Sequence, residues 1–160
     1  MKIAYFVGTF REIDGVTRVL LKIIEEANRR NIGNTLVTGW YDRTRNYPTK
    51  IIKVSSVNLP FYRAYYLPFP AVRQFKKQID QFKPDLIHIH SPETLCWAAI
   101  RYAKEKKIPI IATHHTDFTE YLPYYHMSLA EPLLWAILRN LYNRTRLVTT
   151  PSIVIAKKLK

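Results

Sequence analysis

Three short segments at or after the ends of apolar runs contain glycine or histidine, residue types that could carry chemistry there. Gly15 lies in GTFREIDGVT after the first run, His90 closes LIHIH, and His114 and His115 follow IPIIAT. In a doubly wound sheet, ligands collect at the carboxyl ends of the strands, so these residues are predicted to share one edge. A glycine at a helix start lets backbone amides approach a phosphate. Of two adjacent histidines on an extended chain, only one can face that edge.

Other kinds of site fit these residues less well. Three histidines and Asp117 could bind a metal, but neither HExxH nor a comparable ligand spacing is present. GxGxxG, P-loop and GxSxG patterns are also absent, which argues against a Rossmann dehydrogenase. Cys96 is predicted to pack inside the protein, and as the single cysteine it excludes an internal disulfide. His88 is predicted to be a core histidine, and Gly15 could be a plain turn glycine.

The composition suits one compact domain. The chain has 160 residues, of which 48% are hydrophobic and 23% charged. No apolar run approaches the ~18 residues of a transmembrane helix, and we expect no signal peptide. A lone cysteine agrees with a reducing compartment, so a cytoplasmic location is expected.

The charge of the chain is strongly positive and unevenly distributed. Lysine and arginine number 25 against 12 acidic residues, a net charge of +13 that predicts an anionic partner: nucleic acid, a lipid surface or a phosphorylated ligand. Nine basic residues against two acidic ones give residues 41–83 a charge of +7.

The segment 57–68 shows no clear period and contains several aromatic residues. Such residues suit a lipid interface, and they suit RNA stacking nearly as well. A solvated basic face is the plain alternative. The predicted membrane-facing residues are Phe61, Tyr62, Arg63, Tyr65, Tyr66, Arg73, Lys76 and Lys77.

Strand and helix patterns alternate along the chain, which predicts an α/β fold with a doubly wound, Rossmann-like parallel sheet. The first helix is predicted to bury Val16, Val19, Leu20, Ile23, Ile24 and Ala27, which are spaced by three and four. We expect strands at 2–8, 34–38, 50–56, 86–90, 108–113 and 146–150, and helices at 16–30, 70–82, 93–107, 129–141 and from 151 onward.

Four motifs, taken in this order, resemble the N-terminal half of a retaining glycosyltransferase of family 4 with the GT-B fold. They are IDGV (13–16), PDLIHIHSP (84–92), IPIIATHHTDFTEYLPYY (108–125) and VTTPS (148–152). The segment HTDFTEYLPYY resembles the subgroup that transfers glucose or mannose to lipids. Enzymes of this family have two Rossmann-like domains. The resemblance therefore implies that residues 1–160 form the N-terminal, acceptor-side domain, and that the C-terminal donor-binding domain is absent from this chain.

The resemblance also implies roles for individual residues. His115 would be catalytic and reach the transferred sugar near its reacting carbon, while His90 and Tyr121 would line the acceptor cleft. The implied contacts to the donor diphosphate and sugar are Gly15, Arg18, Thr116 and Asp117. Neither a metal nor another cofactor is expected, because helix dipoles and basic side chains supply positive charge. Two departures from the family pattern are Asp14-Gly15, where many relatives have two glycines, and Gly33-Asn34, where Gly-His is usual.

The function implied by the resemblance is transfer of a sugar from a nucleotide sugar to an acceptor, in particular a membrane lipid such as diacylglycerol or a phospholipid. The protein would lie in the cytoplasm, peripheral to the inner, anionic face of the cell membrane, without a nucleic-acid partner. The domain alone is expected to be inactive. The alternative is a basic nucleic-acid-binding α/β domain, which explains the charge but not His90 or His115. A self-sufficient enzyme of this length would need its own nucleotide fingerprint.

Overall fold

A six-stranded parallel sheet forms the centre of the protein, as predicted. The computed structural model describes residues 1–11, 15–59, 62–69, 71–90, 92–115 and 128–159. The strands lie in the order β5-β3-β1-β8-β9-β10, so the chain moves outward from β1 in one direction and then crosses back to continue in the other. This is the doubly wound order. The strands are β1 (Lys2–Phe6), β3 (Gly33–Thr38), β5 (Lys50–Lys53), β8 (Leu86–Ile89), β9 (Ile110–Thr113) and β10 (Leu147–Thr149).

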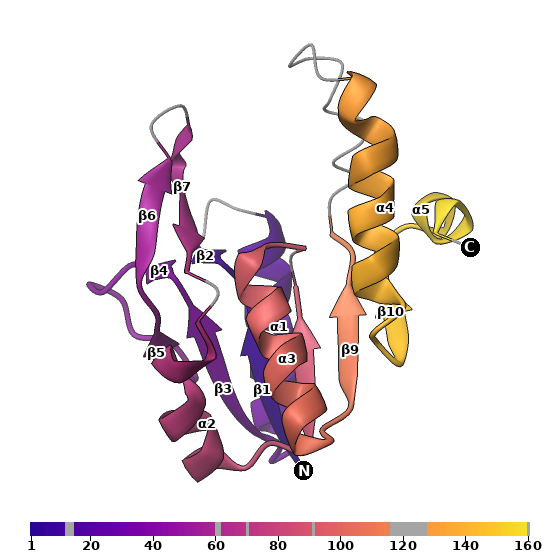
Figure 1. The fold of residues 1–160 in the computed structure, drawn as a ribbon. Helices are drawn as coiled ribbons and strands as arrows, with labels where there is room; N and C mark the ends of the chain where they lie inside the picture. The colour runs from indigo at the N-terminus through magenta and orange to yellow at the C-terminus, as the bar shows by residue number, and fades with distance from the viewer. Residues whose placement is uncertain (12–14, 60–61, 70, 91, 116–127, 160) are drawn as a thin grey trace.

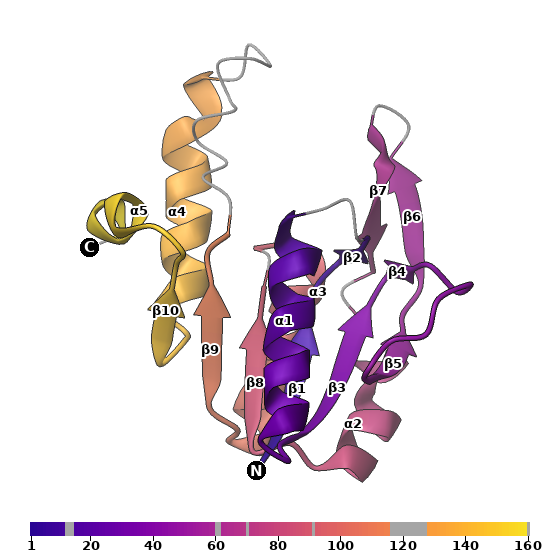
Figure 2. The ribbon, with the colours of Figure 1, turned by 180° about the vertical axis from the view of Figure 1, so that it is seen from behind.

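Helices lie on both faces of the sheet. α1 (Gly15–Arg29) covers one face (Figure 2), and α2 (Lys76–Phe82) and α3 (Thr94–Lys106) cover the other (Figure 1). α4 (Glu131–Tyr142), preceded by η3 (Ser128–Ala130), contributes Leu141 to the core on the α3 side, and α5 (Ile153–Lys158) follows β10. None of the described helices is both long and apolar enough to cross a membrane.

Side-chain alternation in the strands divides the core into two layers, because neighbouring residues point to opposite faces. In β8, Ile87 and Ile89 pack with α3, whereas the His88 ring lies 5.7 Å from the ring of Tyr5 in the layer beneath α1. The buried stripe of α1 is Thr17, Leu20, Ile24 and Ala27. Val19, which was predicted to lie in this stripe, is 42% exposed. That part of the prediction is wrong, because the helix turns the side of Thr17 toward the sheet.

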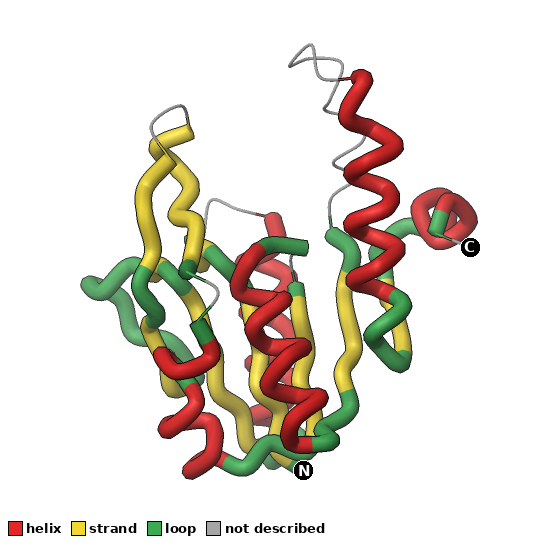
Figure 3. Tube along the Cα trace, viewed as in Figure 1, coloured by secondary structure: helices red, strands yellow, loops and turns green. Residues whose placement is uncertain are grey.

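The segment without a clear period forms a β-hairpin. β6 (Ser56–Leu59) pairs antiparallel with β7 (Tyr62–Pro68), and the register shifts between Asn58 and Leu59. Such an irregularity breaks the period of two that would reveal the strands. The predicted strand 50–56 therefore combines two strands, β5 and the start of β6. The hairpin projects beyond the carboxyl ends of the central strands (Figure 3). Two short strands, β2 (Thr9–Phe10) and β4 (Trp40–Tyr41), pair in parallel beside it.

The predicted helix 70–82 is interrupted at Phe75. A short 3-10 helix, η1 (Val72–Gln74), precedes Phe75, and α2 follows it. Phe75 has non-helical dihedral angles, and its fully buried ring packs edge-on against Phe6 at 5.2 Å and Tyr102 at 5.8 Å between ring centres. Burying this ring outweighs continuing the helix. Pro70, the predicted start, lies outside the described residues. The other predicted helices and strands agree with the structure to within two residues at either end.

Candidate functional site

Three of the singled-out residues come to the same edge of the sheet. Gly15 is the first residue of α1, which follows β1, while His90 follows β8 and His115 lies two residues beyond β9. β1 and β8 are neighbours in the sheet, and the chain leaves them in opposite directions, so the switch point of the fold lies between them (Figure 2). Ligands of doubly wound sheets bind at this position.

His90 and His115 form a hydrogen-bonded pair across neighbouring strands. His90 Nδ1 lies 2.9 Å from His115 Nε2, and the ring centres are 5.2 Å apart. One of these nitrogens must donate and the other accept, so the tautomer of one ring determines that of the other. His90 is 1% exposed and its backbone amide donates to the Phe6 carbonyl at 2.9 Å. Among the described residues, its Nε2 atom has no hydrogen-bond partner. His115 is half-buried.

The imidazoles of this cluster are uncharged at neutral pH. Burial, followed by the neighbouring His114, lowers the pKa of His115 to about 4. Burial also lowers the pKa of His88 to about 4, with a smaller contribution from His115, and brings the pKa of His90 well below its usual value. Rings in this state each offer one donor and one acceptor. Within the described part of the chain, no group of three histidine, cysteine or acidic residues could hold a metal ion.

The structure confirms the predictions made for His88, Cys96 and the His114-His115 pair. His114 points away from His115, and its Nδ1 atom lies 2.7 Å from the Tyr142 hydroxyl. His88 is buried in the sheet, with its Nε2 atom 2.7 Å from Thr113 Oγ1. Cys96 is fully buried in the core on the α3 side. Adjacent histidines thus face opposite ways, and only His115 belongs to the switch-point edge.

The start of α1 presents open backbone. Gly15 is exposed, and a Cβ atom added there would meet no atom of the described residues within 4 Å. The first amides of a helix lack partners within that helix and carry its positive end, so they can bind an anion. Arg18 is exposed on the first turn of the same helix. Thr116, Asp117 and Tyr121 lie outside the described residues, so their predicted roles stay predictions.

Glu93 belongs to the same edge and was missed in the sequence. It is the N-cap residue of α3, and its carboxyl group contacts the Tyr65 hydroxyl and the Gly8 amide. Burial raises the pKa of Glu93 to about 8, although the hydrogen bond from Gly8 acts in the opposite direction. The available signal was an acidic residue directly before a helix, three positions after His90. A side chain there is expected to cap its own helix, so this signal could not reveal contacts with β1 and β7.

The predicted membrane-facing residues separate into different groups. Tyr65 and Tyr66 are half-buried: the first contacts Glu93, and the ring of the second stacks on Trp40 at 5.4 Å. These two rings therefore make contacts within the protein. Phe61 lies outside the described residues, and Tyr62 and Arg63 begin β7. In η1 and α2, Arg73 and Lys77 are exposed, whereas Lys76 pairs with Glu105.

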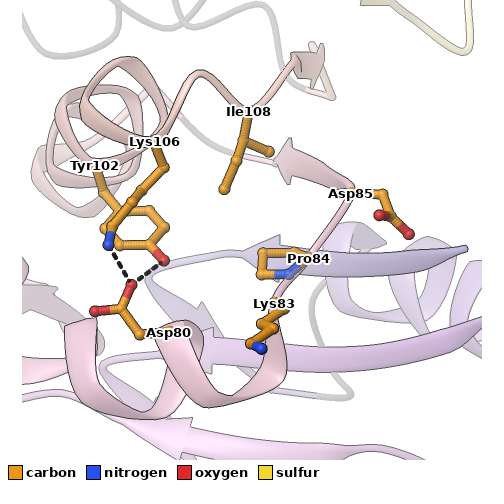
Figure 4. Close-up of a pocket in the computed structure, with 7 residues that line it drawn as sticks. All are labelled: Asp80, Lys83, Pro84, Asp85, Tyr102, Lys106 and Ile108. Carbon is orange, nitrogen blue, oxygen red and sulfur yellow. Dashed lines mark hydrogen bonds and ion pairs between the residues drawn. The ribbon is translucent and has the colours of Figure 1, made fainter.

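A pocket of about 600 Å³ lies at the opposite end of the sheet, where the strands begin (Figure 4). Asp80 accepts hydrogen bonds from Lys106 at 2.9 Å and from the Tyr102 hydroxyl at 2.8 Å. These two bonds lower the pKa of Asp80. Asp80, Tyr102 and Lys106 thus bind one another, and none of the residues singled out in the sequence for sugar transfer lines this pocket.

The sheet order defines a Rossmann-like domain of the GT-B type. Solved structures share this fold. Sucrose-phosphate synthase from Thermosynechococcus elongatus superposes with a TM-score of 0.62 at 15% identity, over 92% of this chain and 41% of that one. UDP-GlcNAc 2-epimerase from Methanocaldococcus jannaschii gives a TM-score of 0.58 at 13% identity, over 99% and 41%.

The chain belongs to Glycosyltransferase Family 4, whose family model matches residues 13–160. It is 32% identical over 113 residues to a sulfoquinovosyl transferase of Arabidopsis thaliana, covering 71% of this chain and 22% of that protein. It is 30% identical over 129 residues to an alpha-monoglucosyldiacylglycerol synthase of Streptococcus pneumoniae (78% and 29%). A GDP-mannose-dependent alpha-mannosyltransferase of Corynebacterium glutamicum is 25% identical over 169 aligned positions (100% and 40%). The chain thus spans less than half the length of each of these relatives.

Proposed function

We propose that this chain is the N-terminal, acceptor-side domain of a retaining glycosyltransferase that moves a sugar from a nucleotide sugar to a membrane lipid, such as diacylglycerol or a phospholipid. The observation that carries the proposal is that the helix start at Gly15 and the hydrogen-bonded His90–His115 pair follow neighbouring strands at the same edge of the sheet. The relatives' names support it, since they include a GDP-mannose-dependent transferase and a synthase of a glucosylated diacylglycerol.

The chemistry of such a transfer needs two kinds of help from this edge. A retaining transfer passes through an oxocarbenium-like state while a nucleoside diphosphate leaves, so negative charge develops on phosphate. The amides at the start of α1, with Arg18 nearby, would stabilise that charge without a metal. The neutral His115 would orient the sugar by a hydrogen bond rather than act as a nucleophile. Thr116 and Asp117 are proposed as further donor contacts, and Tyr121 as an acceptor contact.

A transfer assay with the full-length protein tests this function. Labelled hexose from UDP-glucose or GDP-mannose is expected to appear on diacylglycerol or phosphatidylinositol in vesicles, with the anomeric configuration of the donor retained. Residues 1–160 alone are expected to show no transfer, because the second domain of this fold completes the donor site. A full-length protein that leaves both lipids unlabelled with both donors would contradict the proposed function.

The position of the positive charge supports peripheral contact with an anionic membrane. β5 is an edge strand, and the 42–49 connection, the β6–β7 hairpin, η1 and α2 all lie on its side of the sheet in both views (Figures 1 and 2). We call this surface the basic edge. Each basic residue near an anionic lipid surface contributes ~1 kcal/mol. The proposed membrane contact also includes residues 61–63, which lie in the sequence at the junction of β6 and β7. The exposed basic residues of this edge are Arg43, Arg45, Lys50, Lys53, Arg73 and Lys77.

Vesicle co-sedimentation tests the membrane contact. Full-length protein is expected to bind anionic vesicles in a salt-sensitive manner, and the variant Arg73→Ala/Lys77→Ala is expected to bind about 30-fold more weakly, the equivalent of two basic contacts. Arg139→Ala/Lys157→Ala is the matched control, because it removes the same charge from α4 and α5, beyond the other edge of the sheet. Binding that ignores anionic lipid and salt would remove the membrane proposal. Stronger, salt-sensitive binding to RNA would favour a nucleic-acid-binding domain instead.

A further inference from the structure

Glu93 joins three elements that are far apart in the sequence. Its backbone carbonyl accepts a hydrogen bond from the Cys96 amide at 3.0 Å and so begins α3, but its side chain does not cap that helix. The carboxyl group instead contacts the Tyr65 hydroxyl in β7 and accepts a hydrogen bond from the Gly8 amide beyond the end of β1. An N-cap carboxylate usually stabilises its own helix by about 1 kcal/mol. Here the side chain makes long-range contacts in place of that local one.

The Gly8 side of this contact leaves no room for a side chain. A Cβ atom at position 8 would overlap the Glu93 carboxyl group. The Gly8 carbonyl in turn accepts hydrogen bonds from the Gly39 amide at 2.8 Å and from Thr38 Oγ1 at 3.0 Å. The peptide after β1 is therefore held between the end of β3 and Glu93. The chain continues from this peptide into β2, which precedes α1 in the sequence.

The Tyr65 side of the contact anchors the hairpin. Next to Tyr65, the backbone of Tyr66 exchanges two hydrogen bonds with Thr9 Oγ1, at 3.0 and 3.1 Å. At the end of β7, the Pro68 carbonyl accepts a hydrogen bond from Thr94 Oγ1. The base of the β6–β7 hairpin thus rests on β2 and on the start of α3, and the Glu93 carboxyl group contacts the hairpin next to these two supports.

We propose that Glu93 is a positioning residue for the acceptor side of the sugar-transfer site: it holds the β6–β7 hairpin in a fixed place against Gly8, which lies between β1 and β2. This inference rests on the proposed function, in which the hairpin belongs to the lipid side and the start of α1 to the donor side. The Tyr65 hydroxyl and the Gly8 amide both donate to the Glu93 carboxyl group. The amide of glutamine keeps one oxygen that can accept from Gly8, and its NH₂ group can donate to the Tyr65 oxygen, because a phenol both donates and accepts. Glutamine at position 93 should therefore keep the contacts with Gly8 and Tyr65, whereas alanine and the shorter aspartate should lose them.

Kinetics of the full-length enzyme test this role. Glu93→Ala is expected to raise the KM for the lipid acceptor about tenfold, the effect of one lost buried hydrogen bond, and to leave the donor KM within about threefold. Glu93→Gln is expected to stay within about threefold of the parent for both substrates, and Glu93→Asp to resemble Glu93→Ala. Adding Tyr65→Phe to Glu93→Ala should change the acceptor KM by less than about twofold, because both changes remove the same contact. An equal rise in both KM values, or no rescue by glutamine, would overturn the proposal.

Hydrogen exchange provides a test that does not depend on transfer activity. The amides of residues 56–68 are expected to exchange about tenfold faster in Glu93→Ala and at the parental rate in Glu93→Gln, while the amides of β3 stay unchanged. Unchanged exchange in the hairpin of Glu93→Ala would overturn the positioning role even in an active enzyme. A parent enzyme that transfers no sugar to lipid, yet shows the expected exchange, would instead refute the proposed function while Glu93 still anchors the hairpin.

Discussion

Replacing His115 with alanine in the full-length enzyme is expected to lower turnover about 100-fold or more while leaving the protein folded. Removal of one positioned hydrogen-bond donor from a transition state typically costs ~10²- to 10³-fold in kcat. His115 is half-buried and paired with His90 at 2.9 Å, so its ring is held in place before the substrate arrives. Steady-state kinetics of parent and variant, together with their circular dichroism spectra, provide the measurement. Near-normal turnover of a folded His115→Ala variant would refute the assignment.

His90 supplies matched variants for this prediction. The amide of asparagine can take the place of the imidazole Nδ1 atom, which is the atom that contacts His115, whereas the amide of glutamine reaches the place of Nε2. His90→Asn should therefore retain more turnover than His90→Gln.

Because burial lowers the pKa of His115 to about 4, this ring stays neutral as the pH falls from 7 to about 5. A loss of kcat that follows protonation of His115 near pH 6.5 would contradict this description of the site.

Gly8→Ala is expected to lower the free energy of unfolding by about 3 kcal/mol. The added Cβ atom would overlap the Glu93 carboxyl group, and the displaced carboxyl would lose its contacts with Gly8 and Tyr65. Overpacking in a protein interior costs ~1 to 3 kcal/mol, and an unsatisfied buried polar group costs a similar amount. Urea unfolding of the full-length protein, followed through signals of this domain, measures the change.

Gly15→Ala is the matched control for Gly8→Ala. No atom of the part of the chain that the structure describes lies within 4 Å of the Cβ position of Gly15, and alanine favours helix over glycine, so stability should change by no more than about 1 kcal/mol. If the diphosphate approaches the backbone here, the same methyl group should weaken donor binding about tenfold, which isothermal calorimetry can measure. Equal stability losses in the two variants would contradict the packing described at Gly8. Unchanged donor affinity in Gly15→Ala would remove that residue from the proposed phosphate site.

Much of the fold was predictable because its signals are local. The alternation of Ile87 and Ile89 with His88 and His90 follows from the pleat of a single strand, and it separates the side of β8 that packs with α3 from the side that packs with Tyr5. The opposite directions of His114 and His115 follow from the same geometry. Neighbouring residues thus contain the information for the order of strands and helices, and for the edge at which Gly15, His90 and His115 meet.

The contacts that make this edge specific depend on packing between distant segments. His90 meets His115 because β8 and β9 pair in parallel with Ile89 opposite Ala112, a register that neither strand encodes alone. Glu93 reaches Gly8 and Tyr65 only after β1, β7 and α3 have come together, and the break at Phe75 follows from the place its ring finds beside Phe6. Hydrogen bonds and ring packing of this kind depend on which distant residues lie close together in the folded protein, and the local periodicity of a sequence does not show this.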